Sequence, residues 1–249
     1  MMLNFYSLTP LNISKNFMTS PKNNSQNFID FNQSRYQHEC DYANAHTRMS
    51  LMASFIPKNK KVLDVGCGNG IFFTFIKSPK KNFYGIDASP TAILSAKKRC
   101  FQAKVSDLHQ KFPYSDNTFD YVTAGEIIEH IYDTDFFLSE IKRVLKPNGF
   151  LVLSTPNLAT LGRRFMLLLG QNPLIETSLR IGAGHIRYFT YKSLNQLLTY
   201  HQFKIINFTS DVVNFNNQGT VSSRLLAKLY PKFGARLIIK ALNQKLIPN

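Results

Sequence analysis

The segment Val62-Leu-Asp-Val-Gly-Cys-Gly-Asn-Gly70 constrains the fold more than any other part of the chain. The apolar run at 61–65 predicts a short buried strand, and glycines follow it at alternate positions. Glycine accepts positive φ and lets the backbone pass close to a ligand. A turn of this kind at the carboxyl end of a strand is typical of α/β folds that bind ligands there. Taken alone, it is also compatible with a purely structural turn.

Strands and helices alternate after this turn. Short apolar runs predict further strands at 82–87, 102–106, 119–124 and 150–154. Helical patterns cover 69–77, 89–100 and 133–145, and another precedes the turn at 35–56. Repeated βα units of this length predict a parallel sheet with helices on both faces. Farther along we expect a helix at 191–201, a strand at 204–208 and a last strand at 236–241.

Composition sets outer limits on the protein class. The 249 residues carry 30 basic and 15 acidic side chains, a formal net charge of +15. This surplus favours an anionic partner, or it reflects only a solvated basic surface. The three cysteines form no CxxC pair, which predicts reduced thiols in a cytoplasmic protein. No apolar run reaches the 18 residues of a membrane span, and the Asn-rich residues 1–34 predict a loosely ordered arm.

Acidic residues end three successive predicted strands. Asp64 lies inside the first strand end, where a carboxylate repels a pyrophosphate but suits a cationic ligand with an amino group. Asp87, about 20 residues past the turn, stands where α/β folds bind ribose hydroxyls. Asp107 can accept a hydrogen bond from an adenine amino group. Together with the spacing GxGxG in place of GxGxxG, these acids indicate S-adenosylmethionine and disfavour a nicotinamide dinucleotide.

Four stretches carry a family resemblance: VLDVGCGNG, YGIDAS, SDLHQKFPYSDNTFDYVTAGEIIEHI and LSEIKRVLKPNGFLVLSTPN. Over residues 61–156 they resemble class I S-adenosylmethionine-dependent methyltransferases. GHIRYFTYKSLNQLLTYHQFKI and YPKFGARLIIKA are similar to the C-terminal part of a subgroup that includes the ubiquinone-biosynthesis O-methyltransferases. The resemblance implies a Rossmann-like α/β fold with a seven-stranded, mostly parallel sheet in the order 3-2-1-4-5-7-6, the last strand antiparallel. We expect one domain over 35–249, with a lid-like insertion at about 157–189 and a basic helical insertion at about 219–231.

The same resemblance implies a set of cofactor-binding residues. The glycines approach the cofactor with their backbone, one acid binds the ribose, and another lies near the methionine amino group. The residues expected to bind S-adenosylmethionine are Asp64, Gly66, Cys67, Gly68, Gly70, Asp87, Ala88, Asp107, Leu108 and Gly125.

The cluster Glu126-Ile-Ile-Glu129-His130 follows the fourth strand, at the reaction site. If it starts a helix, Glu126 shares a face with Glu129 and His130. His185 follows in a loop that the family folds over the same cleft. Two carboxylates and two imidazoles suit a divalent cation, which would acidify an acceptor hydroxyl. Quinone O-methyltransferases and small-RNA 2′-O-methyltransferases carry a similar ExxEH with a later His, and some use a metal.

A second interpretation of this cluster needs no metal. Glu129 and His130 then cap and orient the helix, and the reaction is an in-line displacement in which positioning supplies much of the rate. His130 and His185 are the candidate bases for a protonated acceptor, and Glu126 faces the sulfonium and the acceptor. Without a cation, one of the two neighbouring carboxyls is expected to have a raised pKa.

The acceptor is less constrained. Apolar residues lie on both sides of Arg163 and Arg164 in the segment 158–169, and no acid follows Asp211, a pattern that resembles interfacial helices or an ordinary solvated face. We expect O-methylation of a small-molecule or lipid-like acceptor, with peripheral contact to an anionic membrane as one alternative. An RNA-directed methyltransferase is a rival, although no RNA-binding motif is visible and nucleic acid is the less expected partner. A non-catalytic cofactor-binding module is a second rival. The sequence does not predict the oligomeric state.

Overall fold

The computed structural model describes residues 42–99, 102–173, 184–215 and 221–244. Its main sheet has seven strands in the order β3-β2-β1-β4-β5-β9-β6. The strands are β1 (Val62–Val65), β2 (Phe83–Asp87), β3 (Gln102–Val105), β4 (Phe119–Gly125), β5 (Leu145–Pro156), β6 (Phe203–Thr209) and β9 (Arg236–Asn243). Strand β9 is antiparallel to both of its neighbours, while the pairs among β1 to β5 are parallel. The predicted order 3-2-1-4-5-7-6 and the antiparallel last strand are confirmed, since β9 is the seventh strand of this sheet along the chain and lies between β5 and β6.

Helices cover both faces of this sheet. The α-helices are α2 (Tyr42–Ser54), α3 (Pro90–Lys98), α4 (Thr134–Val144), α5 (Leu161–Leu168), α6 (Tyr191–Tyr200) and α7 (Arg224–Leu229). Short 3-10 turns are η1 (Ile71–Phe75), η2 (Lys80–Asn82), η3 (Ile128–His130) and η4 (Pro231–Phe233). A separate two-stranded ribbon pairs β7 (Val213–Asn214) with β8 (Ser222–Ser223).

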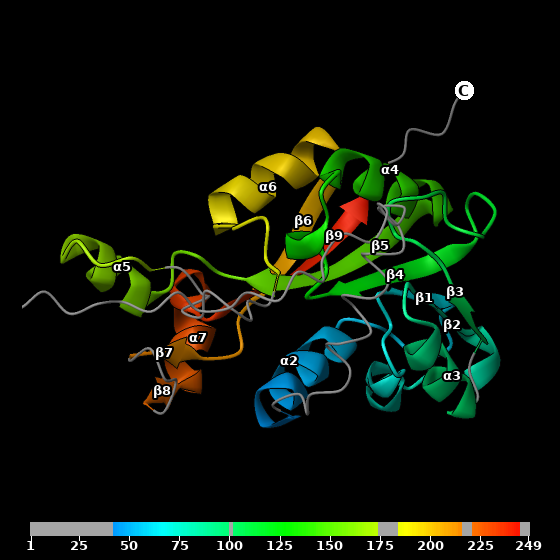
Figure 1. The fold of residues 1–249 in the computed structure, drawn as a ribbon, viewed down its shortest axis with the longest axis horizontal. Coiled ribbons are helices and arrows are strands. Elements are labelled where there is room, and N and C mark those ends of the chain that lie inside the picture. The colour runs from blue at the N-terminus through cyan, green and yellow to red at the C-terminus, as the bar shows by residue number, and fades with distance from the viewer. Residues whose placement is uncertain (1–41, 100–101, 174–183, 216–220, 245–249) are drawn as a thin grey trace, which may run out of the picture.

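The buried apolar side chains divide between the two faces. On one face, α4 and α6 pack on the sheet through residues such as Phe137, Ile141 and Leu194. On the other, α2 and α3 pack through Met52 and Ile93. Figure 1 shows this division, with α4 and α6 above the sheet and α2 and α3 below it. Burial of these side chains stabilises each helix on the sheet by about 25 cal/mol for each Å² of apolar surface removed from water.

Local signals explain where several helices begin. Ser89 Oγ accepts from Ala92 N at 3.2 Å, and Pro90 occupies the first turn of α3. Thr190 and Ser193 form a reciprocal capping box at the start of α6. These caps place both helix starts at the carboxyl edge of the parallel strands, the edge at which such folds bind ligands.

Some predicted boundaries are wrong. The helix expected at 69–77 is only the 3-10 turn η1, because the left-handed Gly70 (φ 78°) directly precedes Ile71 and leaves five residues before the extended Ile76. The strand expected at 150–154 begins earlier, at Leu145, because Leu145 already pairs with Phe119 of β4. The ribbon of β7 and β8 was not predicted. The expected arm 1–34, the start of the helix at 35–56 and part of the lid-like insertion lie outside the described residues.

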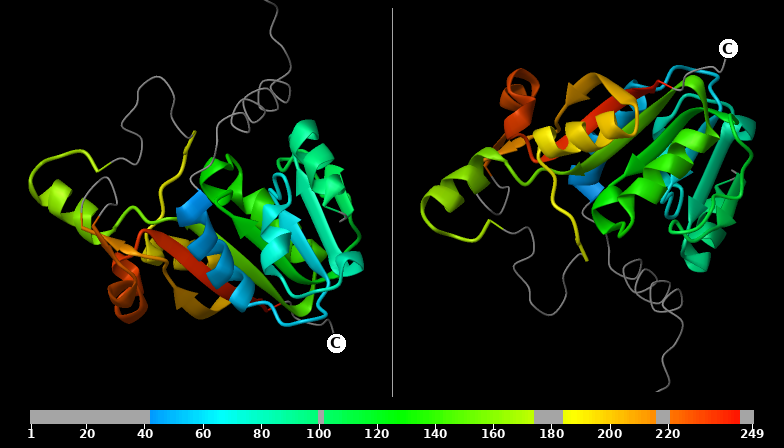
Figure 2. Two further views of the ribbon diagram at one scale, coloured as in Figure 1. Left: turned by 90° about the horizontal axis from the view of Figure 1, so that it is seen from below. Right: turned by 90° about the horizontal axis from the view of Figure 1, so that it is seen from above.

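One end of the molecule projects from the sheet. Helices α5 and α7 lie together at this end, away from β1 to β3, in Figure 1 and in both views of Figure 2. The residues of α5 are all at least partly exposed. Within the described residues, no helix is long and apolar enough to cross a membrane.

Candidate active site

The glycine turn after β1 has backbone angles that only glycine adopts readily. Gly66, Gly68 and Gly70 have φ values of 74°, 53° and 78°. A side chain at Gly66 would also meet Ile127, because a Cβ built there lies 2.2 Å from Ile127 Cδ1. The turn therefore presents bare backbone at the carboxyl edge of the sheet, as the sequence predicted.

Asp64 is buried in the strand that leads into this turn, with 5% of its surface exposed. Its Oδ1 accepts a hydrogen bond of 2.6 Å from Thr123 Oγ1 on the neighbouring strand β4. Burial raises the pKa of Asp64 to about 7, although this hydrogen bond acts in the opposite direction. A cationic group beside Asp64 would restore its ionised form.

Asp87 is the last residue of β2, and its carboxylate binds the backbone of the glycine turn that follows β1. Its Oδ2 accepts from Gly68 N and its Oδ1 from Ser89 N, both at 2.9 Å. The carboxylate is therefore held in one orientation at the end of its strand. Asp107, the expected adenine contact, is engaged differently: its Oδ1 accepts from His109 N at 2.9 Å.

A cavity of about 720 Å³ opens over these strand ends, a volume typical of a small-molecule site. Eight of the ten expected cofactor residues line it: Asp64, Gly66, Cys67, Gly68, Asp87, Ala88, Leu108 and Gly125. Gly70 and Asp107 are not among the lining residues. Glu126 and His130 line its far side, so the cofactor half and the expected reaction site share one cavity.

Helix α2 forms a wall of the cavity that no motif in the sequence indicates. Its lining residues are Ala45, His46, Arg48, Met49 and Met52. Arg48 reaches toward β5, where one guanidinium nitrogen (NH1) donates to Ser154 Oγ at 3.4 Å. The Arg48 Nε is buried and makes no hydrogen bond within the described residues. A buried donor without a partner is costly, and it is the kind of group that a bound anion satisfies.

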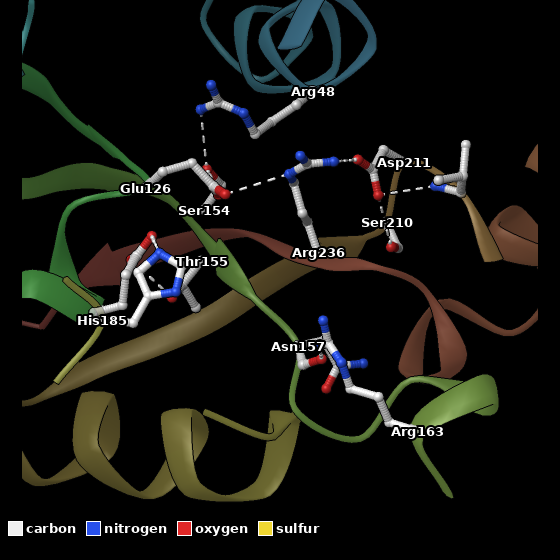
Figure 3. A network of polar contacts seen from close by, with 12 residues as sticks. Arg48, Glu126, Ser154, Thr155, Asn157, Arg163, His185, Ser210, Asp211 and Arg236 are labelled. Carbon is white, nitrogen blue, oxygen red and sulfur yellow. Dashed lines mark hydrogen bonds and ion pairs between the residues drawn. The ribbon is translucent and has the colours of Figure 1, made fainter. Parts of the chain in front are cut away.

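Glu126 lies at the centre of the polar network in Figure 3. It has a positive φ of 57°, which is strained for a residue with a side chain. Ser154 Oγ donates to Glu126 Oε1 at 2.8 Å, and Arg236 Nε to Glu126 Oε2 at 3.3 Å. Arg236 also donates to Asp211 Oδ2 at 2.6 Å. The backbone bends at Glu126, so the condition that a helix starts there is not met, and only the single turn η3 follows.

The other members of the predicted metal site do come together. Glu129, His130 and His185 each offer a ligand atom, and these atoms lie within 4.8 Å of one another. The rings of His130 and His185 have centroids 4.7 Å apart, and His185 Nε2 is 3.9 Å from Glu129 Oε1. Glu126 is not part of this group, because both of its carboxylate oxygens are bound to Ser154 and Arg236.

The pKa of Glu129 agrees with the expectation that one of the two neighbouring carboxyls has a raised pKa. Burial, together with the negative charge of Glu126, raises the pKa of Glu129 to about 8. Thr155 Oγ1 donates to Glu129 Oε2 at 2.9 Å, and Glu129 Oε1 is buried without a hydrogen bond within the described residues. The His130 Nδ1 lies 3.0 Å from the carbonyl oxygen of Gly184. A carbonyl can only accept, so Nδ1 carries the proton and the lone pair of the neutral ring is on Nε2.

The family is shown by a match over most of the chain. Residues 36–207 match the model of a methyltransferase domain. Together with the fold and the cavity described above, this places the chain among the class I S-adenosylmethionine-dependent methyltransferases. The chain belongs to that family.

Curated relatives match over a shorter length. The chain is 35% identical over 122 residues to the mitochondrial ubiquinone biosynthesis O-methyltransferase of Schizosaccharomyces pombe, an alignment that covers 46% of this chain and 44% of that protein. It is 36% identical over 107 residues to the ubiquinone biosynthesis O-methyltransferase of Pelagibacter ubique, covering 40% and 43%. The match thus spans less than half the length of either relative.

A solved structure supports the fold. An S-adenosylmethionine-dependent methyltransferase of Thermotoga maritima superposes with a TM-score of 0.63 at 17% identity, covering 87% of this chain and 97% of that one. At this identity the likeness shows the Rossmann-like architecture, and the acceptor has to be inferred from the site.

Proposed function

We propose that this protein transfers the methyl group of S-adenosylmethionine to a hydroxyl of a small-molecule or lipid-like acceptor by in-line displacement. The observation that carries the proposal is the single cavity of about 720 Å³. It joins the glycine turn and the acids of β1 and β2 to Gly125, Glu126 and His130. Cofactor and acceptor would therefore meet at one edge of the sheet.

The cavity offers complementary groups to each part of the cofactor. Asp87 is placed for the ribose hydroxyls and Leu108 for the adenine ring. The buried Asp64 suits the cationic amino group, and the unpartnered Nε of Arg48 suits the methionine carboxylate. This arrangement directs the sulfonium toward Gly125 and Glu126. The residues present therefore fit S-adenosylmethionine.

A hydroxyl acceptor needs to lose a proton, and the imidazoles beside the cavity can take it. His130 presents the lone pair of Nε2 because its Nδ1 is bound to Gly184 O. His185 stacks beside His130 and approaches Glu129. We assign His130 as the general base, with His185 as the alternative. Positioning of the acceptor oxygen opposite the sulfonium supplies much of the remaining rate enhancement.

A divalent cation is a second way to activate the same hydroxyl. Glu129, His130 and His185 are the residues that would hold it, and their mixed oxygen and nitrogen atoms are ligands that zinc and other transition metals accept. Ligands about 2.1 Å from one ion lie about 3.4 Å apart in a tetrahedron and at most about 4.2 Å apart, so a pair of atoms 4.8 Å apart would have to close by roughly 0.6–1.4 Å. Such an ion would lower the pKa of a bound hydroxyl. Glu126 would join only by leaving Arg236.

We also propose a peripheral contact with anionic membranes, at the end formed by α5 and α7. Large apolar side chains are exposed there: Phe165, Leu167, Leu168, Leu169, Leu225, Leu229 and Tyr230. Arg163 and Arg164 lie in α5, Arg224 and Lys228 lie in α7, and no acid follows Asp211 in the chain. Apolar side chains interleaved with cations are typical of helices that lie in a membrane interface. This surface would bring a lipid-like acceptor to the enzyme.

The proposal is tested in two steps. Calorimetry should show binding of S-adenosylmethionine and S-adenosylhomocysteine but not of NAD. Asp87→Ala should weaken that binding tenfold or more, since lost charged hydrogen bonds cost about 1.5–3 kcal/mol. Mass spectrometry should then detect a methyl ether after incubation with catechol and labelled cofactor, but no N-methyl product from o-phenylenediamine. Tight NAD binding, or methylation of the amine alone, contradicts the proposal.

A further inference from the structure

A second groove, distinct from the active-site cavity, lies where α5 faces the start of α6. It has a volume of about 450 Å³ and shares no lining residue with the larger cavity. We call it the α5–α6 groove. Its lining residues are Leu158, Ala159, Arg164, Leu167, Thr190, Tyr191, Lys192 and Lys232.

The charged residues of this groove are all cationic. Arg164, Lys192 and Lys232 line it from three different elements, α5, α6 and η4, and no acid is among the described lining residues. None of the three forms an ion pair with a carboxylate of the described residues. Cations gathered in a concave site without a counter-charge repel one another, and an anionic ligand relieves that repulsion.

Aromatic rings hold two of these cations in place. Lys232 Nζ lies 5.0 Å from the centroid of the Tyr191 ring, and Arg164 Cζ lies 5.1 Å from that of Phe233. Tyr191 in turn packs on Phe208 with centroids 4.5 Å apart. Arg164 Nε also donates to Ala159 O at 2.9 Å, which fixes the plane of the guanidinium. Arg164 and Lys232 are therefore held by contacts that bring no carboxylate of the described residues to them.

The number and kind of the cationic groups indicate the class of anion. A guanidinium with its Nε occupied still presents its two terminal nitrogens, which match two oxygens of a phosphate. Two ammonium groups beside it suit the third oxygen and a charge of about −2, as in a phosphate monoester. A carboxylate offers one charge and two oxygens, too little for all three cations.

The apolar residues indicate what the phosphate is attached to. Leu158, Ala159 and Leu167 line the same groove, and Leu167 is exposed to 58%. An organic group bonded to the phosphate would cover this apolar surface. We propose that the α5–α6 groove binds a phosphate ester, with the phosphate on Arg164, Lys192 and Lys232 and the organic part against Leu158 and Leu167.

The test measures binding without methyl transfer, so it is independent of the proposed reaction. Calorimetry at constant ionic strength would compare inorganic phosphate, glycerol 3-phosphate, monomeric dihexanoylphosphatidic acid and the uncharged dihexanoylglycerol. The phosphates should bind and dihexanoylglycerol should not. If glycerol 3-phosphate binds as tightly as the short-chain lipid, the ligand is a water-soluble ester; a lipid that binds at least tenfold more tightly indicates a phospholipid headgroup. Either result supports a phosphate-ester site.

Matched double variants separate this site from general basicity. Arg164→Gln with Lys232→Gln should weaken glycerol 3-phosphate binding at least tenfold. Lys81→Gln with Lys97→Gln removes the same charge from exposed positions outside the groove and should change binding less than twofold. All four side chains are exposed, and S-adenosylhomocysteine binding reports that each variant is folded. Equal losses in both pairs, or no phosphate binding by the unaltered protein, overturn the proposal.

Discussion

Arg236 joins two carboxylates that lie 85 residues apart in the chain: its Nε is 3.3 Å from Glu126 Oε2, and its NH1 is 2.6 Å from Asp211 Oδ2. Asp211 is buried, whereas Glu126 is partly exposed on the wall of the cavity. The first strand residue of β9 thus fixes the residue that follows β4, at the point where the backbone bends with a positive φ. The shape of the acceptor side of the cavity depends on this contact.

Replacing Arg236 should therefore cost stability as well as activity. In Arg236→Met the buried Asp211 loses its cationic partner and keeps only the hydrogen bonds from Ser210 Oγ and Val212 N, and breaking a buried ion pair costs about 3–5 kcal/mol. Because Glu126 is partly solvated, we expect about 3 kcal/mol, measured by urea unfolding. Adding Asp211→Asn should recover part of that loss, since no buried charge then remains unpaired. A single variant as stable as the unaltered protein would show that the contact does not form in solution.

The sequence predicts features that depend on local patterns, but not contacts that depend on the packing of distant segments, such as the ion pair from Arg236 to Glu126. The sequence predicts the β1 turn, with Asp64 and Asp87 at successive strand ends. These features depend on local patterns of apolar residues and glycine. No local pattern predicts the position of the Arg48 side chain. The sequence predicts α2 only as a helix with an apolar face, and the packing of this helix on the sheet brings the guanidinium to Ser154. The ion pair from Arg236 to Glu126 likewise depends on β9 inserting between β5 and β6.

The arrangement of the ExxEH cluster, residues 126–130, also depends on how the chain folds outside the motif. Its spacing predicts shared faces only if a helix starts at Glu126. The chain instead bends at Glu126, and the two ends of the motif separate into different polar networks. The approach of His185 to His130 was expected from the family resemblance and is found, because the loop carrying His185 is bound through Ile186 N and Arg187 N to the carbonyl oxygen of Glu129.

Arg48 is expected to bind the methionine carboxylate of the cofactor. Arg48→Met should weaken S-adenosylhomocysteine binding about tenfold or more, because a hydrogen bond to a charged group contributes about 1.5–3 kcal/mol. 5′-Methylthioadenosine lacks the amino-acid group, so its affinity should not change. Calorimetry with both ligands measures the difference. Equal losses for the two ligands would assign Arg48 a structural role in place of a carboxylate contact.

The raised pKa of Asp64 predicts proton release on cofactor binding. At pH 6 the carboxyl is mostly protonated, since its pKa is about 7, and the cationic amino group of the cofactor favours the ionised form. Binding should therefore release close to one proton at pH 6 and almost none at pH 9. Binding enthalpies in buffers of different ionisation enthalpy measure this release. Asp64→Asn should abolish it; release that persists in the variant would come from another group, such as Glu129.

The same shift predicts how the stability of the cofactor-free protein depends on pH. The pKa of Asp64 rises from 3.8 to about 7 on folding, so the folded state binds the extra proton between these values. The contribution of Asp64 to the free energy of unfolding is therefore greatest below pH 4, falls as the pH rises toward 7, and is constant above it. Asp64→Asn should flatten the pH profile of urea unfolding over that interval. An unchanged slope in the variant would contradict the assignment.

The metal proposal predicts a response that depends on three residues. Zinc or manganese should raise the melting temperature of the protein, because an ion that binds only the folded state stabilises it in proportion to ln(1 + [ion]/Kd). Glu129→Gln and His185→Gln should remove the increase. His201→Gln, whose ring pairs with Asp135 on the surface of α4, is the matched control and should retain it. Full activity in chelator, with no thermal shift, would leave His130 or His185 to act as a base without a metal.

The membrane proposal predicts binding that needs both charge and apolar contact. Liposomes containing anionic lipid should bind the protein, more weakly as salt rises, while neutral liposomes should not. Phe165→Ser with Leu168→Ser and Leu169→Ser should reduce binding at least tenfold, since each buried side chain contributes up to about 1.5–3 kcal/mol. Leu94→Ser with Tyr200→Ser alters side chains that are equally exposed, at 60% and 79%, but lie outside α5 and α7. That control should bind as the unaltered protein does.

A gel shift with RNA in the same buffers tests the rival partner, whose binding would also weaken steeply with salt. RNA binding without liposome binding would favour the RNA-directed methyltransferase, whereas equal binding to neutral and anionic liposomes would contradict the charge-dependent contact.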